Sequence, residues 1–104
     1  MPTFHRALAE ADLAEGQMRG LVLNGLDLVL VRTKDGLYAM DNQCTHGAAR
    51  LSEGRLRGVR VICPLHGASF DCRSGAVLAL PARDPQRAYP TRILDGWIEV
   101  ELGS

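Results

Sequence analysis

Short apolar runs separated by polar turns recur along most of the chain, which is the pattern of antiparallel β-strands. Two runs, 18–23 and 26–32, are separated only by Asn24-Gly25, the strongest short-range signal for a β-hairpin. Lys34-Asp35-Gly36 then predicts a turn into a third strand at 37–40. We expect these three segments to form a meander.

The C-terminal segment predicts a second hairpin, in which residues 91–94 and 97–102 flank an Asp95-Gly96 turn. Apolar and acidic residues alternate in its last strand, where Ile98, Val100 and Leu102 are interspersed with Glu99 and Glu101. Successive side chains of a strand point to opposite faces, so we expect the apolar face to be buried and the acidic face to lie in water.

The remaining segments predict further β structure around these two hairpins. We expect an edge strand at 3–8, a turn with one helical loop at 10–16, and strands at 59–62 and 76–80. Three prolines make 81–90 an extended connection. The length of 104 residues is that of one domain. The predicted fold is therefore all-β, a single domain over 1–104 whose antiparallel base carries a small lobe inserted at about 42–75.

Two short motifs in this lobe carry the candidate chemistry, Cys44-Thr45-His46 and Cys63-Pro64-Leu65-His66. Thiolate and neutral imidazole are common ligands of transition metals, so the two motifs supply four ligands. A tetrahedral zinc site and a Rieske [2Fe–2S] cluster both fit such a set. Structural zinc sites usually pair two cysteines and then two histidines, whereas each motif here is mixed, which favours two metal ions.

The motifs C-T-H-G and C-P-L-H-G-A-S-F-D resemble the cluster-binding signature of Rieske-type ferredoxins. The similarity continues through Leu51-Ser52-Glu53-Gly54 and Ser74-Gly75 to Pro81-Ala82. It is strongest to the small soluble ferredoxins that serve bacterial aromatic-ring-hydroxylating dioxygenases.

This resemblance implies a Rieske-type antiparallel β sandwich that binds one [2Fe–2S] cluster. Cys44 and Cys63 would bind one iron, and His46 and His66 would bind the other through Nδ1. The chain would then carry single electrons from an NAD(P)H-dependent flavoprotein ferredoxin reductase to the Rieske centre of a terminal oxygenase. Because the four ligands leave no open coordination position for substrate, we do not expect the chain itself to be an enzyme.

Two other functions are compatible with the ligand motif. The chain could be the small Rieske-like subunit of an assimilatory nitrite reductase, although members of that group often lack some of the cluster ligands. It could also be a zinc-stabilised interaction domain without redox chemistry.

Charge and composition bear on the partners of the protein and on its location in the cell. The 12 basic and 12 acidic residues cancel, so we expect no nucleic-acid partner. Residues 42–75 carry a balance of +3, and their arginines could form a docking face or simply be solvated. These are Arg50, Arg55, Arg57, Arg60 and Arg73. The chain has no membrane-length apolar run and no signal-peptide pattern, and the third cysteine, Cys72, lacks a disulfide partner, so we expect a soluble cytoplasmic protein.

Residues outside the ligand set have simpler expected roles. We expect Cys72 to be a small core side chain and His5 to be a surface or half-buried residue. Gly47 and Gly67 each follow a ligand histidine, and we expect their N–H groups to point at the cluster sulfides.

The resemblance also bears on the redox potential. High-potential Rieske proteins of respiratory complexes have an extra, disulfide-bonded cysteine in each cluster loop and two hydroxyl donors to the cluster sulfurs. Here Ala48 and Leu65 stand at the cysteine positions, and Ala68 and Phe70 at the hydroxyl positions. We therefore expect a potential near the low end of the Rieske range.

Overall fold

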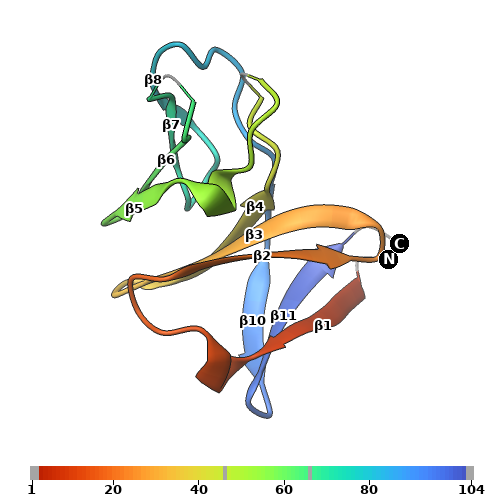
Figure 1. Cartoon of the computed structure of the whole chain (residues 1–104). Helices are drawn as coiled ribbons and strands as arrows, with labels where there is room; N and C mark the ends of the chain where they lie inside the picture. Colours follow the sequence, from red (N-terminus) through yellow and green to blue (C-terminus); the bar gives the residue numbers. More distant parts are fainter. Residues whose placement is uncertain (1–2, 46, 66, 103–104) are drawn as a thin grey trace.

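The computed structural model describes residues 3–45, 47–65 and 67–102, and shows three antiparallel β-sheets (Figure 1). Within the described residues there is no α-helix, only two short 3-10 turns at Glu10–Asp12 and Leu51–Glu53. The all-β prediction is confirmed. A base of two sheets forms one part of the molecule, and the third, smaller sheet stands on it.

The sheets have simple antiparallel orders. The first base sheet has the order β1-β11-β10, with β1 at Thr3–Ala9, β10 at Thr91–Leu94 and β11 at Trp97–Leu102. The second has the order β2-β3-β4-β9, with β2 at Met18–Leu23, β3 at Leu26–Thr33, β4 at Gly36–Asp41 and β9 at Ala88–Tyr89. The small sheet has the order β5-β6-β7-β8, with β5 at Arg55–Arg57, β6 at Arg60–Ile62, β7 at Ser69–Asp71 and β8 at Val77–Ala79.

Both predicted hairpins are confirmed, and their turns show why the sequence signal was reliable. Asn24 and Gly25 between β2 and β3 have φ of 50° and 80°, and Asp95 and Gly96 between β10 and β11 have φ of 53° and 80°. Two successive positive φ values are what a two-residue turn needs to match the twist of its strands. Asn or Asp followed by Gly adopts this backbone at low cost.

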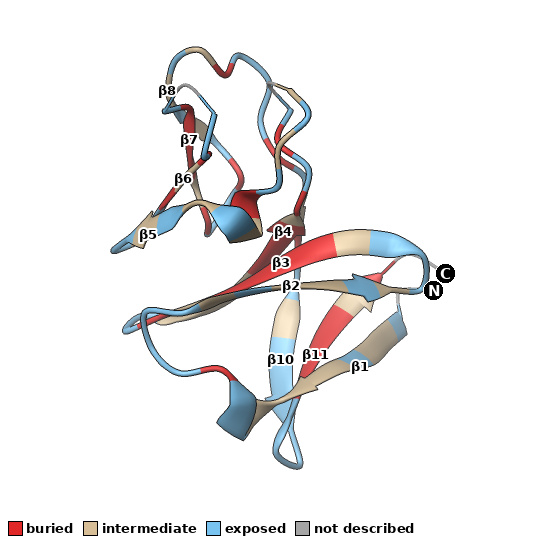
Figure 2. Cartoon of the chain, viewed as in Figure 1, coloured by how far each residue is buried: buried red, intermediate tan, exposed pale blue. Residues whose placement is uncertain are grey.

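Strand β3 holds the molecule together because it is buried on both faces. Leu28 and Leu30 belong to a cluster with Ile98 and Val100 of the first base sheet, so they join the two base sheets. The intervening residues, Val29 and Val31, belong to the cluster beneath the small sheet. Figure 2 shows the buried stretch of β3 between the two parts of the molecule. Alternate side chains of one strand therefore support both the base and the lobe.

Two local expectations are wrong. Glu99 is 6% exposed rather than in water, because Arg92 and Arg6 from the neighbouring strands cover its carboxylate at 2.7 and 3.8 Å. Segment 81–90 is not purely a connection either, because its last residues form β9, which pairs with β4 at Ala39 and Met40. In both places a neighbouring strand decides the outcome: Arg6 and β4 are remote in sequence, and Arg92 reaches Glu99 across the β10-β11 hairpin.

Candidate metal centre

Two loops of the lobe begin with the predicted ligand cysteines and are closed in the same way. The backbone N–H of Cys44 donates to the carbonyl of Ala49 at 2.8 Å. The N–H of Cys63 donates to the carbonyl of Ala68 at 2.7 Å. Each loop is therefore a six-residue segment tied at its base, and its cysteine stands at the tie. This closure fixes where both thiols start relative to the small sheet.

The two thiols lie buried beside each other. Cys44 and Cys63 are each 2% exposed and neither forms a disulfide. Burial raises the pKa of the Cys63 thiol, the Leu65 amide that donates to its sulfur at 3.5 Å lowers it in part, and the adjacent Cys44 thiol raises it again. A pair of reduced thiols in such a place becomes a thiolate pair only beside strong positive charge, as a metal ion supplies. The donor set therefore fits a ferric ion held by two cysteines.

The other half of the predicted ligand set cannot be placed. His46 and His66 both lie outside the described residues. Among the residues that are described, no three histidines, cysteines or acids converge as a metal site. The structure thus brings Cys44 and Cys63 together, and the ligation by the two histidines stays a prediction.

The remaining cysteine and histidine have the roles expected of them. Cys72 is completely buried in the core under the small sheet, and burial raises the pKa of its thiol to about 11. A thiol that stays protonated is a poor nucleophile and a poor ligand. His5 lies in β1 of the base, half-buried, where its ring contacts the Asn24 amide at 3.2 Å.

The Gly47 N–H has a contact within its own loop, since it donates to the Cys44 carbonyl at 3.2 Å. That the N–H groups of Gly47 and Gly67 point at the cluster sulfides stays a prediction. Gly67 has a φ of +74°, a backbone conformation that side chains with a Cβ rarely adopt. A glycine is therefore needed to turn the second loop at this position.

The sequence reasoning missed Gln86, which anchors the first ligand loop. This side chain is 3% exposed, and its Oε1 accepts from the Thr45 N–H at 2.7 Å. Its Nε2 donates to the carbonyls of Asp41 and Gln43, both at 2.8 Å. The Thr45 hydroxyl adds a bond of 2.6 Å to the Asp84 carbonyl. A lone glutamine between prolines gives no sequence signal, because its partners lie more than forty positions away in the chain.

The segment that carries Gln86 is itself held close to the small sheet. The backbone N–H of Gln86 donates to the Gly75 carbonyl at 2.8 Å. Gly75 has a φ of +82°, and a Cβ built on it would collide with the Gln86 carbonyl oxygen. Only glycine permits this approach, so the glycine after β7 positions the glutamine that holds the loop of Cys44.

We predict that Gln86→Leu lowers the free energy of unfolding of the iron-loaded protein by about 3 kcal/mol or more. The change leaves one buried N–H and two carbonyls without their partner, and each unsatisfied group costs about 1–3 kcal/mol. Denaturant titration measures the loss. Gln43→Leu, at the exposed position just before that loop, is the control and should be nearly neutral. Equal effects of the two changes would show that Gln86 has no anchoring role.

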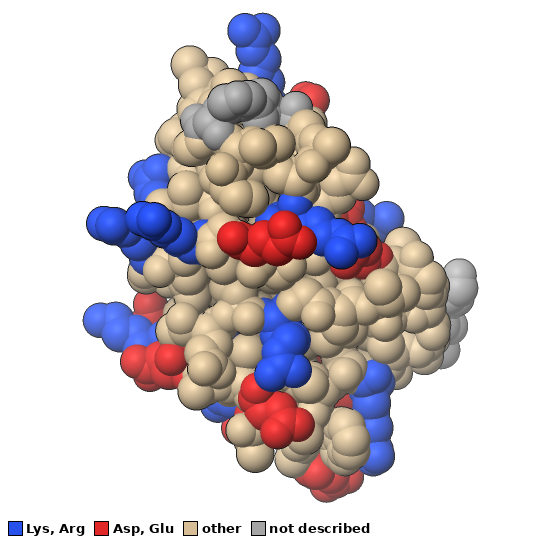
Figure 3. Space-filling model, in the orientation of Figure 1, with Lys and Arg blue, Asp and Glu red and all other residues tan. Residues whose placement is uncertain are grey.

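Two of the lobe's arginines are already paired with acids. Arg50 contacts Asp27 of the base at 3.2 Å. Arg73 binds Asp71 through Nε and Nη2 at 3.0 and 2.8 Å, and these bonds lower the pKa of that carboxyl. Figure 3 shows such basic and acidic pairs on the surface. These two residues therefore contribute little free charge to a docking face.

Comparison with known proteins gives consistent matches. A family model described as the Rieske [2Fe-2S] domain matches residues 3–90. The ferredoxin component of the naphthalene 1,2-dioxygenase system of Pseudomonas putida is 38% identical over 96 residues, 92% of each chain. The anthranilate 1,2-dioxygenase ferredoxin subunit of Burkholderia cepacia is 39% identical over 100 residues, 96% of this chain and 93% of its own.

Solved structures agree with these relatives. The ferredoxin of Sphingomonas yanoikuyae B1 superimposes with a TM-score of 0.92 at 31% identity, covering 97% of this chain and all of its own. A chain in the complex of reduced oxygenase and oxidised ferredoxin of carbazole 1,9a-dioxygenase superimposes with a TM-score of 0.89 at 31% identity, covering 94% of this chain and 92% of its own. A putative NADH-dependent nitrite reductase small subunit from Mycobacterium tuberculosis superimposes with a TM-score of 0.88 at 26% identity, covering all of this chain and 98% of its own.

A search of the described residues for a helix long and apolar enough to span a membrane finds none.

Proposed function

The chain belongs to the Rieske [2Fe-2S] domain family, and from this premise we propose that Cys44, His46, Cys63 and His66 hold its cluster. The protein is a ferredoxin component of an aromatic-ring dioxygenase system and transfers electrons to the terminal oxygenase. It is an electron carrier, not an enzyme in its own right. We propose that residues 1–104 act as a single domain in this role, with the lobe as its cluster-binding part.

The observation that carries the ligand assignment is the pair of reduced, buried thiols at the bases of two similarly closed loops. When bound, the cluster takes up and releases one electron at a time, and two thiolates in place of four give it a higher potential than all-cysteine clusters have. The chain's own residues bury the thiolates away from water, and the Leu65 N–H donates to the Cys63 sulfur. Such a bond to sulfur stabilises the more negative, reduced state.

The proposed electron source is a flavoprotein reductase that uses NAD(P)H. Dioxygenase systems with a separate ferredoxin component need a donor for it, and a low-potential cluster suits a nicotinamide-dependent reductase. We place the protein in the cytoplasm, where its three free cysteines would stay reduced.

The likeness to the nitrite reductase small subunit supports a second candidate function. Two observations favour the dioxygenase ferredoxin. By structural superposition the identity to the chain from the carbazole 1,9a-dioxygenase ferredoxin complex is 31%, against 26% for the nitrite reductase subunit, and all four predicted cluster ligands are present in the sequence.

The test is reconstitution with purified components. With NADH, a ferredoxin reductase and the terminal oxygenase of an aromatic-ring dioxygenase system, the iron-loaded protein should restore hydroxylation of the oxygenase's aromatic substrate. Omitting the chain should abolish it. Restoration of nitrite reduction instead, with the matching large subunit, would support the second candidate.

A further inference from the structure

A hollow of about 610 Å³ lies beside the second ligand loop and is not used in the function described so far. One wall consists of Cys63, Pro64 and Gly67 of that loop. Arg55 and Arg57 of β5 also line it. The hollow therefore connects two cationic side chains directly with the loop that holds one of the cluster thiols.

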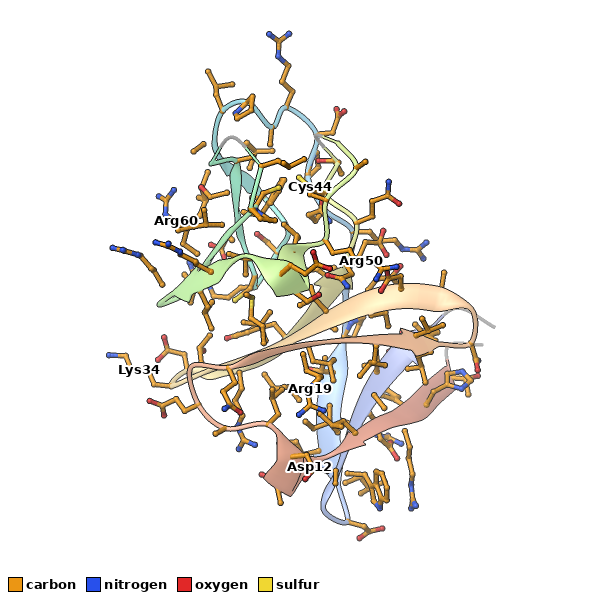
Figure 4. All side chains as sticks on the ribbon, viewed as in Figure 1. Asp12, Arg19, Lys34, Cys44, Arg50 and Arg60 are labelled. Atoms are coloured by element: carbon orange, nitrogen blue, oxygen red, sulfur yellow. The ribbon has the colours of Figure 1, made fainter. Side chains whose placement is uncertain are left out.

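The charge on this wall is not neutralised within the chain. Arg55 and Arg57 are exposed, and in the part of the chain that the structure describes neither has an acidic partner within 4.0 Å. Arg60, opposite Arg57 in the β5-β6 pairing, bonds only to the neutral hydroxyl of Ser69, at 2.6 Å. Glu53 is the acid in the wall of the hollow, so the wall keeps one positive charge in excess, and Arg60 beside it adds another. Figure 4 labels Arg60 on this side of the lobe.

The arginines Arg57 and Arg60 lower the stability of the small sheet. Like charges directly opposite each other across an antiparallel pair, as Arg57 and Arg60 are, destabilise it. In contrast, Arg50 and Arg73 of the same lobe are both neutralised by acids. An unfavourable cluster of free charge next to a ligand loop is the kind of local inconsistency that functional sites show.

We propose that this hollow, walled by Arg55 and Arg57, is the docking site for an acidic segment of the terminal oxygenase. The proposal rests on the function proposed above and adds the surface that binds the oxygenase and the chemistry of its counterpart. Arg55 and Arg57 are alternate residues of one strand, so their side chains leave the same face about 7 Å apart. They match a segment that carries two carboxylates at a similar spacing, as alternate residues of an extended chain do. Seated there, the segment would lie against Cys63 and Pro64.

The test is the rate of electron transfer from the reduced, iron-loaded protein to the terminal oxygenase used in that reconstitution. Arg55→Glu with Arg57→Glu should slow transfer about tenfold or more at low salt, because it replaces attraction by repulsion. The deficit should shrink as ionic strength rises to about 0.5 M, where such charges are screened. An unchanged absorption spectrum of the variant would show that its cluster is intact.

The control is Arg19→Glu, on an exposed residue of the base (Figure 4), compared with the single change Arg55→Glu, which alters the net charge equally. It should leave the rate within about twofold of the wild type. Equal slowing by both variants would overturn the proposed site. So would a variant that is reduced more slowly by the reductase but passes electrons to the oxygenase at the normal rate. Unchanged rates would also overturn it and leave docking to the apolar side chains of the lobe, such as Leu65. In each of these cases the wild type still reduces the oxygenase, whereas a wild type that does not would refute the proposed function itself.

Discussion

Cys44→Ala and Cys63→Ala are each expected to abolish binding of the cluster, whereas Cys72→Ala is expected to retain it. All three thiols are buried in the same core, at 2%, 2% and 0% exposure, so burial alone does not distinguish them. Only the first two stand at the closed bases of the ligand loops. Iron content and visible absorption of natively purified protein measure the outcome. Loss of a ligand should also destabilise the lobe, because binding a metal centre contributes free energy to folding.

Cys72→Ala separates ligation from packing. It removes one buried sulfur and should cost about 1 kcal/mol or somewhat more in the free energy of unfolding, without loss of iron. The histidines allow the same comparison, since His46→Ala and His66→Ala should lose the cluster while His5→Ala, in β1 of the base, should keep it. Retention of full iron by Cys44→Ala, or its loss in Cys72→Ala, would refute the ligand assignment.

The double change Ala68→Ser with Phe70→Tyr is expected to raise the redox potential by some tens of millivolts per hydroxyl. Both side chains are completely buried in the core cluster that contains the two ligand thiols. A hydroxyl that donates to sulfur stabilises the reduced state, and about 1 kcal/mol of such preference shifts a one-electron couple by about 40 mV. Redox titration followed by visible absorption measures the shift, and each single change should give part of it.

The same reasoning predicts the potential of the unmodified protein. It lacks hydroxyls at Ala68 and Phe70, and cysteines at Ala48 and Leu65. We therefore expect a value near the low end of the Rieske range, roughly −150 mV. A measured potential well above zero, or no rise in the double variant, would contradict the role assigned to these positions.

The elements that the sequence predicted well are those whose cause is local. Asn24-Gly25 and Asp95-Gly96 specify turns through their own backbone preferences, so both hairpins could be predicted from neighbouring residues. The ligand motifs were equally readable, because each cysteine and histidine lie within four consecutive residues.

The features that escaped prediction depend on side chains of other strands and segments. Glu99 was expected in water from its alternation with apolar residues, but Arg92 and Arg6 of the adjacent strands cover it. The guanidinium of Arg92 also lies over the Phe4 ring at 4.1 Å, which keeps it in place above the sheet. Gln86 is the more consequential case, since its bonds join the segment after β8 to the first ligand loop. Such tertiary contacts have no periodicity or motif by which to detect them.

Metal analysis of the natively purified protein tests the central claim most directly. A Rieske cluster held by Cys44, His46, Cys63 and His66 predicts about two irons and two acid-labile sulfides per chain, with the visible absorption of a red-brown protein. A colourless protein with one zinc and no sulfide would contradict the account, because the same four residues would then form a structural zinc site without redox chemistry.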